Sequence, residues 1–257
     1  MIALLLELLP GTVFAYLIAF ARIGAVIMLL PGVGEDYIPA RIRLALALMV
    51  AAVIAPTVGA ALPPLPAKPV ELALSLGAEI AVGLGIGLAT RFLLSAMQTA
   101  GTIVSNMSGL AIGSSFDPTS GTQGTEIGVM MNLAAVAVVF ATDTHHLLLR
   151  AAADSYLVFP PTGLPPTGDF ADLVTRLMSY AFVLAIQISA PFLVYGVVIN
   201  TAMGLVNRMM PSMQVFFVLT PVQTLLAIAA LMAAMPAMLA WFAASFEARM
   251  AEFMMPR

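Results

Sequence analysis

The sequence predicts an all-α protein of the integral membrane type, with about six long and partly broken hydrophobic helices. Of its 257 residues, 61% are hydrophobic and only 9% are charged, against about 25% charged in ordinary soluble domains. The apolar residues also gather in long segments, most of which meet the roughly 20 residues that a membrane-spanning helix needs. The chain therefore belongs in a bilayer or inside an apolar assembly.

Six apolar segments are expected to form these helices: residues 12–30, 42–62, 70–98, 127–149, 171–206 and 213–245. The separators between them contain paired prolines and glycines, which end helices. Segments 70–98 and 171–206 exceed one bilayer crossing, so they are expected to bend or to project beyond the lipid. Internal prolines at positions 191, 221 and 236 predict further breaks.

The charge composition excludes several classes of function. The net charge is −3 and Lys68 is the single lysine, so the chain offers no basic patch for nucleic acid. It has no cysteine, which excludes disulfides and thiolate-ligated metal. The first residues, MIALLLELL, lack the positive region of a cleavable signal, so insertion is expected to use the first apolar segment.

Two features of the apolar segments predict helix packing. Gly83 and Gly87 form a GxxxG pattern, which lets two helices approach at backbone distance, although glycine is also simply frequent in membrane helices. Arg22, Glu79 and Arg91 lie inside apolar segments, where ionisable groups usually face protein or water rather than lipid. We expect these three to be structural charges.

Residues 99–128 form a glycine-, serine- and threonine-rich stretch between two apolar segments. Backbone polar groups without partners are costly in lipid, so this stretch must be buried in protein or line an aqueous path. We interpret it as a gate or plug loop, with an ordinary turn-rich connector as the alternative. Its candidate residues are Ser108, Gly109, Gly113, Phe116, Asp117, Pro118, Gly121 and Gly124.

Three types of residue in this loop carry the interpretation. The glycines permit backbone conformations closed to other residues. Phe116 offers a bulky apolar wedge, and Asp117 with Pro118 starts a turn in which the carboxylate can accept backbone N–H groups. We expect Phe116, Asp117 and Pro118 to anchor the loop.

Asp143, His145 and His146 form a second polar group, a few residues before Arg150. Histidine beside a carboxylate can relay protons or bind metal. Adjacent histidines point to different faces of a helix, however, and no HExxH spacing is present. We therefore expect a helix-end cluster at the membrane interface, with no metal site, while a proton role stays open.

No enzyme is predicted. The chain has neither a GxxxxGK[ST] loop for a nucleotide nor a GxSxG nucleophile elbow, and its acids are scattered rather than paired. We expect no catalytic residue and no cofactor. A secondary transporter for small solutes would also show broken helices and a glycine-rich loop, but it should display two matching halves. No convincing inverted repeat is visible. A purely structural membrane scaffold is a second alternative.

The ordered segments resemble the FliR/SctT family of type III secretion export-gate subunits, whose flagellar branch is the flagellar biosynthetic proteins FliR. They are ARIGAVIMLLPGVG (21–34), IPARIRLALAL (38–48), SSFDPTSGTQG (114–124), HHLLLRA (145–151) and QISAPFLVYGVVINTAMGLVNRMMPSMQVFFVLTPVQTLLAI (187–228). Arg208 occupies a family-typical position and is expected to cap or bridge the turn between the last two segments.

The resemblance implies a helical export gate in the bacterial inner membrane, at the flagellar basal body and partly lifted towards the periplasm. The implied partners are FliP-like and FliQ-like subunits and an FlhB-like switch protein, with membrane lipid around them and unfolded exported proteins as substrate. Residues 1–185 would be a FliP-like portion, with a plug loop at about 105–125. Residues 186–257 would be a FliQ-like hairpin. The loop and the short C-terminal tail favour the flagellar branch, with an injectisome subunit as the alternative.

Overall fold

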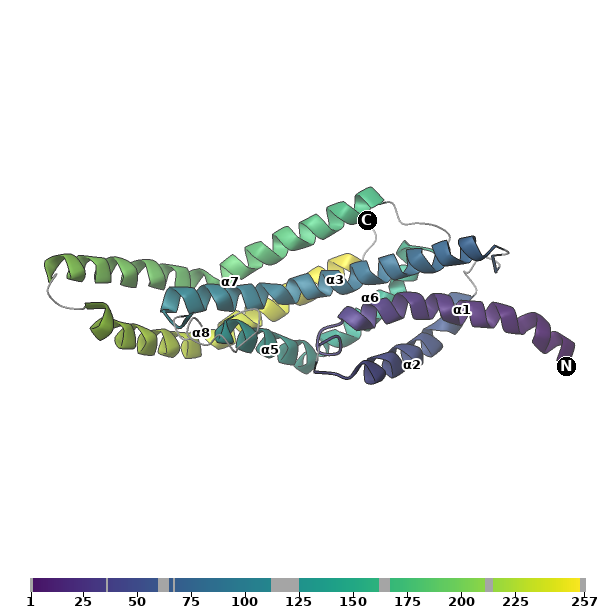
Figure 1. Cartoon of the computed structure of the whole chain (residues 1–257), viewed down its shortest axis with the longest axis horizontal. Helices are drawn as coiled ribbons and strands as arrows, with labels where there is room; N and C mark the ends of the chain where they lie inside the picture. The colour runs from purple at the N-terminus through teal and green to yellow at the C-terminus, as the bar shows by residue number, and fades with distance from the viewer. Residues whose placement is uncertain are drawn as a thin grey trace. The chain divides into compact units, whose positions relative to one another are not determined.

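The computed structural model describes residues 2–35, 37–59, 65–66, 68–111, 125–161, 167–210 and 215–254. Within these ranges the chain forms helices and no strand, which confirms the predicted all-α class. The helices are α1 (Ile2–Leu29), α2 (Ala40–Gly59), α3 (Pro69–Ser108), α5 (Glu126–Ala141), α6 (Thr144–Val158), α7 (Thr167–Met209) and α8 (Val215–Met254) (Figure 1).

Five of the described helices are long and apolar enough to cross a membrane, or six spans if α5 and α6 together count as one bent span. Three of them are much longer than one crossing requires, because α3, α7 and α8 contain 40, 43 and 40 residues. At 1.5 Å per residue each is about 60 Å long, roughly twice the hydrocarbon thickness of a bilayer. These helices either tilt strongly or extend beyond the lipid.

The boundaries predicted for the glycine-rich stretch are wrong at one end. Residues 99–108 continue α3 rather than starting a loop, and α5 begins at Glu126. The polar side chains there support the helix, because Thr102 donates to the carbonyl of Gln98 at 3.0 Å and Ser108 to that of Val104 at 2.6 Å. Such bonds to the preceding turn satisfy a hydroxyl inside a helix.

The predicted single helix over 127–149 is also wrong, because it is divided into α5 and α6. Asp143 adopts a left-handed conformation with φ 56°, and it precedes the first residue of α6. Aspartate is one of the few non-glycine residues that visit this region. The internal prolines lie inside helices, Pro191 within α7 and Pro221 and Pro236 within α8, and a kink at each of them stays a prediction.

The chain folds into two compact units that share its long helices. The first unit comprises residues 1–92, 143–178 and 248–257, and the second comprises residues 93–142 and 179–247. The predicted division near residue 185 falls inside α7 and stays a prediction.

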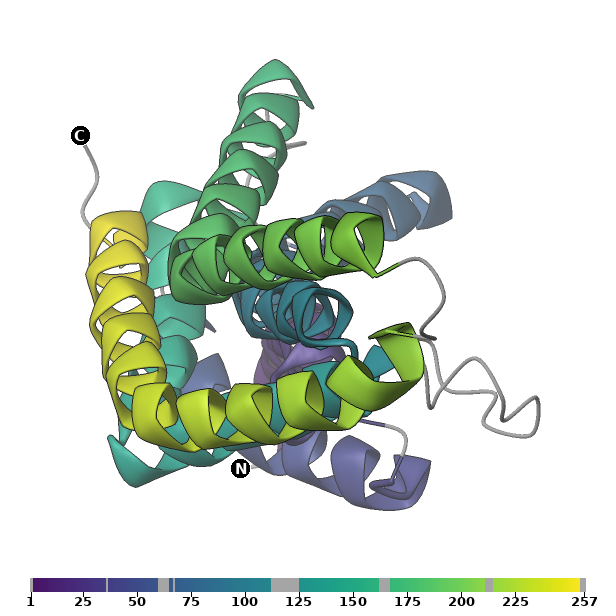
Figure 2. The same ribbon diagram turned by 90° about the vertical axis from the view of Figure 1, so that its left-hand side faces the viewer.

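In the first unit, α1 and α2 run antiparallel side by side (Figure 1). Ala19 of α1 packs with Ala51 and Ala55 of α2, flanked by Tyr16 and Phe20. In the second unit, residues 179–209 of α7 lie beside the first part of α8, and both run across the view in Figure 2. The two units therefore each contain a helix pair and one half of α3.

Candidate functional site

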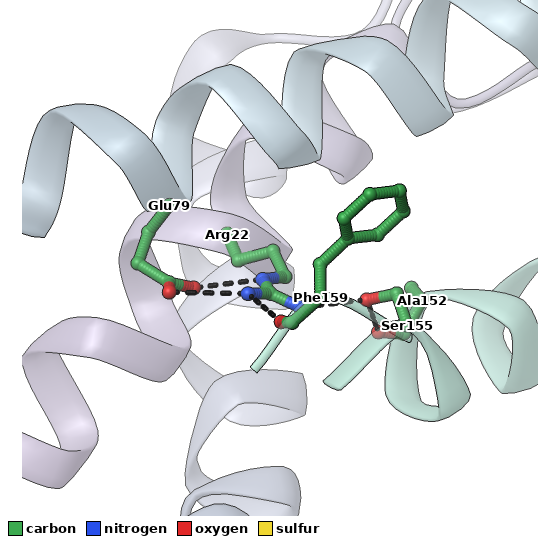
Figure 3. Close-up of polar contacts among 5 residues, drawn as sticks. All are labelled: Arg22, Glu79, Ala152, Ser155 and Phe159. Carbon is green, nitrogen blue, oxygen red and sulfur yellow. Dashed lines mark hydrogen bonds and ion pairs between the residues drawn. The ribbon is translucent and has the colours of Figure 1, made fainter. Parts of the chain in front are cut away.

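A buried arginine joins three helices of the first unit (Figure 3). The Nε of Arg22 on α1 lies 2.7 Å from Glu79 Oε2 on α3, and its Nη2 donates to Glu79 Oε1 at 3.1 Å. Its Nη1 donates to Ser155 Oγ of α6 at 3.1 Å, and Nη2 also donates to the carbonyl of Phe159 at 2.8 Å. The ring of Tyr156 lies 3.8 Å from the guanidinium carbon. We call these five residues the Arg22 cluster.

The chemistry of the Arg22 cluster is structural. Arg22 is 1% exposed and Glu79 is 3% exposed, and the bidentate pairing leaves each charge with an opposite charge in contact. Removing one partner of such a buried pair costs about 3–5 kcal/mol, because the remaining charge stays buried without compensation. The carbonyl of Phe159 belongs to the C-terminal end of α6, where a positive charge is also favourable. The cluster therefore fixes α6 against α1 and α3.

Gly83 and Gly87 lie on the same face of α3 as Glu79, since positions four residues apart share a helix face. A Cβ at Gly83 would overlap the backbone carbonyl of Arg22, and a Cβ at Gly87 would lie 2.6 Å from the Cβ of Leu29. The two glycines thus let α3 approach α1 at backbone distance, directly beside the ion pair. Small residues spaced four apart permit this kind of close packing between two helices.

Two other sequence candidates lie outside this cluster. Arg91 is half exposed and faces the carboxylate of Glu35 at 3.9 Å. Arg208 is exposed in the last turn of α7, where a positive side chain favours the terminal carbonyls. Neither joins the buried charges.

The candidate loop residues are only partly within the described chain. Gly113, Phe116, Asp117, Pro118, Gly121 and Gly124 lie outside the described residues. Ser108 is fully buried at the end of α3. Gly109 follows it with φ 75°, the left-handed conformation that glycine commonly adopts just after a helix.

The helices that flank this segment cross at two glycines of the second unit. A Cβ at Gly101 of α3 would lie 2.6 Å from the Cα of Gly128 on α5. Thr125 caps α5 by accepting the N–H of Gly128 at 3.2 Å. Because backbone meets backbone here, the start of α5 is held against α3, seven residues before α3 ends.

The structure corrects one geometric expectation about the histidines. The rings of His145 and His146 lie 4.0 Å apart between centroids, and their ligand atoms and those of Asp143 all lie within 4.8 Å of one another. Both histidines lie in the first turn of α6, where no preceding turn confines their side chains. The side chains of Asp143 and His146 are largely exposed. They also lie at the N-terminal end of α6, whose positive dipole disfavours the binding of a cation. The absence of a metal site stays a prediction.

Sequence reasoning missed the partners of Arg22, namely Glu79, Ser155 and Phe159. One signal was available for the first of them, because Glu79, Gly83 and Gly87 are spaced by four residues and mark one face of α3. Ser155 and Phe159 carry no such signal, since only the packing of α6 brings them to Arg22.

The fold and these sites define a helical, membrane-type protein whose long helices are joined by a buried ion pair and by close glycine contacts. The chain belongs to the family described as Bacterial export proteins, family 1, which it matches over residues 13–248. It is 36% identical to the flagellar biosynthetic protein FliR of Caulobacter vibrioides over 219 residues, which cover 85% of this chain and 87% of that protein.

Relatives from both the flagellar and the secretion branch of the predicted family are similar to this chain. It is 29% identical to the flagellar biosynthetic protein FliR of Bacillus subtilis, over 81% of each chain. It is 27% identical to the Yop proteins translocation protein T of Yersinia pestis, over 61% of this chain and 60% of that protein. The resemblance predicted from the ordered segments is confirmed, and the protein is a component of a type III export apparatus.

Proposed function

We propose that this protein is a core subunit of the flagellar type III protein export gate in the bacterial inner membrane. The observation that carries the proposal is the match to the export family over residues 13–248, together with FliR relatives that cover more than four fifths of the chain. In this role the chain joins FliP-like and FliQ-like subunits and contacts an FlhB-like switch protein. The pore that they form passes unfolded flagellar proteins.

The exposed apolar surface of the second unit supports an assembly of this kind. Large apolar side chains on α7 and α8 remain uncovered by this chain, among them Val194, Leu225, Met232 and Trp241, which are 59–74% exposed. Exposed apolar side chains gathered on long helices often mark a protein–protein or membrane contact. Lipid and neighbouring subunits would cover these faces.

We further propose that the segment between α3 and α5 plugs the closed pore. Support comes from its composition and from its two ends, since the left-handed Gly109 redirects the chain after α3 and the Gly101–Gly128 contact holds the start of α5 against that helix. A gate needs a segment that can change conformation while both of its ends stay attached to the rest of the protein. These glycines and the Thr125 cap provide such points.

The test is ion leakage across the inner membrane of cells that express the complete gate. Deletion of residues 113–121 keeps the described helix ends, and we expect a clear increase in leakage while the gate still assembles. A matched control replaces the same residues with an equal length of Gly and Ser, which keeps chain length but removes Phe116, Asp117 and Pro118. Unchanged leakage in the assembled deletion variant would remove the plug role.

The second candidate is the corresponding subunit of a secretion injectisome, which the match to the Yersinia pestis protein favours. Complementation separates the two. A flagellar subunit restores swimming when it replaces FliR in Caulobacter vibrioides, whereas an injectisome subunit does not. The higher identity and coverage of the flagellar relatives favour the first outcome.

A further inference from the structure

The end of α3 is capped by a side chain from α8. Gln223 is only 7% exposed, and its Nε2 donates to the carbonyl of Met107 at 3.4 Å. Met107 lies in the last turn of α3, where carbonyls lack the amide partners that a continuing helix would supply. An amide from another helix therefore donates to a carbonyl in the last turn of α3.

Gln223 is in turn held by α7. The hydroxyl of Tyr195 donates to the backbone carbonyl of Gln223 at 2.7 Å. The next residue, Gly196, faces α3, because a Cβ there would lie 2.9 Å from the Cβ of Met107. All these residues belong to the second unit. Three helices thus meet through one tyrosine, one glutamine and one close glycine contact.

The path of the chain after α3 is set at the same place. Gly109 has φ 75°, and a Cβ on it would lie 3.6 Å from Nε2 of Gln223. A side chain at the residue that turns the chain out of α3 would therefore meet the amide that caps α3. We call Met107, Gly109, Tyr195, Gly196 and Gln223 the α3 junction.

We infer that Gln223 and Tyr195 are positioning residues that hold the end of α3 on α7 and α8 in the closed gate, and that the α3 junction must separate during export. This inference rests on the proposed function. The bonds in the junction are suited to reversible opening, because they join neutral groups. One neutral hydrogen bond changes an equilibrium by only about threefold to tenfold, so the junction can hold the closed state without locking it.

The first experiment crosslinks the junction inside the complete gate. The chain contains no cysteine, so the pair Met107→Cys and Gly196→Cys is the single dithiol of this subunit. Their Cβ separation of 2.9 Å is slightly below the roughly 3.5–4.5 Å of a disulfide and requires a small shift. We expect oxidation to form the crosslink and to reduce export at least tenfold, and reduction to restore it.

The matched control crosslinks the other unit. Ala19→Cys and Ala51→Cys join α1 to α2 in the first unit, where both alanines belong to one packed cluster and already carry a Cβ. We expect this crosslink to leave export within about twofold of the reduced protein. Equal loss of export from both crosslinks would overturn the inference, because any covalent restraint on this subunit would then be enough to block export. Undiminished export from the crosslinked Met107–Gly196 pair would overturn it as well.

A second set of variants needs no crosslink and decides the question if the cysteine pair prevents assembly. Gln223→Met keeps the side-chain volume but removes the donor, and Tyr195→Phe removes only the hydroxyl. We expect each to raise ion leakage about threefold to tenfold with assembly preserved. The controls are Gln187→Met and Tyr37→Phe, the same changes at exposed positions, which should not leak.

The leakage results separate failure of this inference from failure of the proposed function. If deletion of residues 113–121 leaks but Gln223→Met and Tyr195→Phe do not leak more than their controls, the α3 junction does not position the gate and only this inference fails. If the deletion itself does not leak, the plug role fails and the inference fails with it.

Discussion

The Arg22 cluster and the α3 junction each join three helices, and α3 takes part in both, yet they are built from different chemistry. The Arg22 cluster uses a buried, bidentate ion pair between side chains. The α3 junction uses neutral hydrogen bonds to backbone carbonyls. Breaking a buried ion pair costs about 3–5 kcal/mol, whereas a neutral hydrogen bond contributes about 0.5–1.5 kcal/mol. The first arrangement suits a fixed framework, and the second suits a joint that opens.

Loss of one charge of the Arg22 cluster should have the largest effect. We expect Arg22→Met or Glu79→Met to destabilise the detergent-solubilised gate by about 3–5 kcal/mol, because the remaining charge stays buried without a partner. The double variant should recover much of this loss, since no charge is then buried alone. Thermal denaturation of the purified complex measures both effects.

The control for the ion pair is Lys68→Met, which removes an exposed contact with Glu71. Surface pairs of this kind contribute little, so its melting temperature should match that of the unaltered complex. Single variants at Arg22 and Glu79 that melt like the Lys68 variant would contradict a framework role for the Arg22 cluster.

A methyl group at the glycine crossing should have an intermediate effect. Gly101→Ala places a Cβ 2.6 Å from the Cα of Gly128, and backbone atoms cannot yield as a flexible side chain can. Overpacking of this kind costs about 1–3 kcal/mol. We expect lower thermal stability and increased ion leakage, because the attachment of α5 to α3 is forced apart.

Gly77→Ala is the matched control on the same helix, because nothing lies within 4 Å of a Cβ at that position. Replacing an unhindered helical glycine by alanine should stabilise the helix by about 0.5–1 kcal/mol. Opposite signs for the two alanine variants would support the glycine crossing, while equal behaviour would show that α3 and α5 do not approach so closely.

Removal of the histidines should have the smallest effect. We expect His145→Ala with His146→Ala to export within about twofold of the unaltered protein, because the cluster with Asp143 is largely exposed and lies at the positive end of α6. Export in the presence and absence of a zinc chelator is the measurement. A chelator that slows export of the unaltered protein but not of the double variant would establish a metal site there.

The sequence predicted the parts of the fold that depend on composition and length. Its long apolar segments predicted membrane-type helices, and the glycines at 83 and 87 predicted a close helix contact. It misplaced the end of α3, because Thr102 and Ser108 resemble loop residues until their bonds to the preceding turn are known. It also missed the break before α6, since a single left-handed aspartate leaves no periodic signal.

By itself the sequence determined the all-α class and the resemblance to the export family, because hydropathy and ordered motifs are properties of consecutive residues. The tertiary structure alone decided which charges meet and which helix ends are capped. Arg22 and Phe159 are 137 positions apart, and Met107 and Gln223 are 116 apart. Contacts at such separations arise only when helices pack, so local patterns cannot specify them.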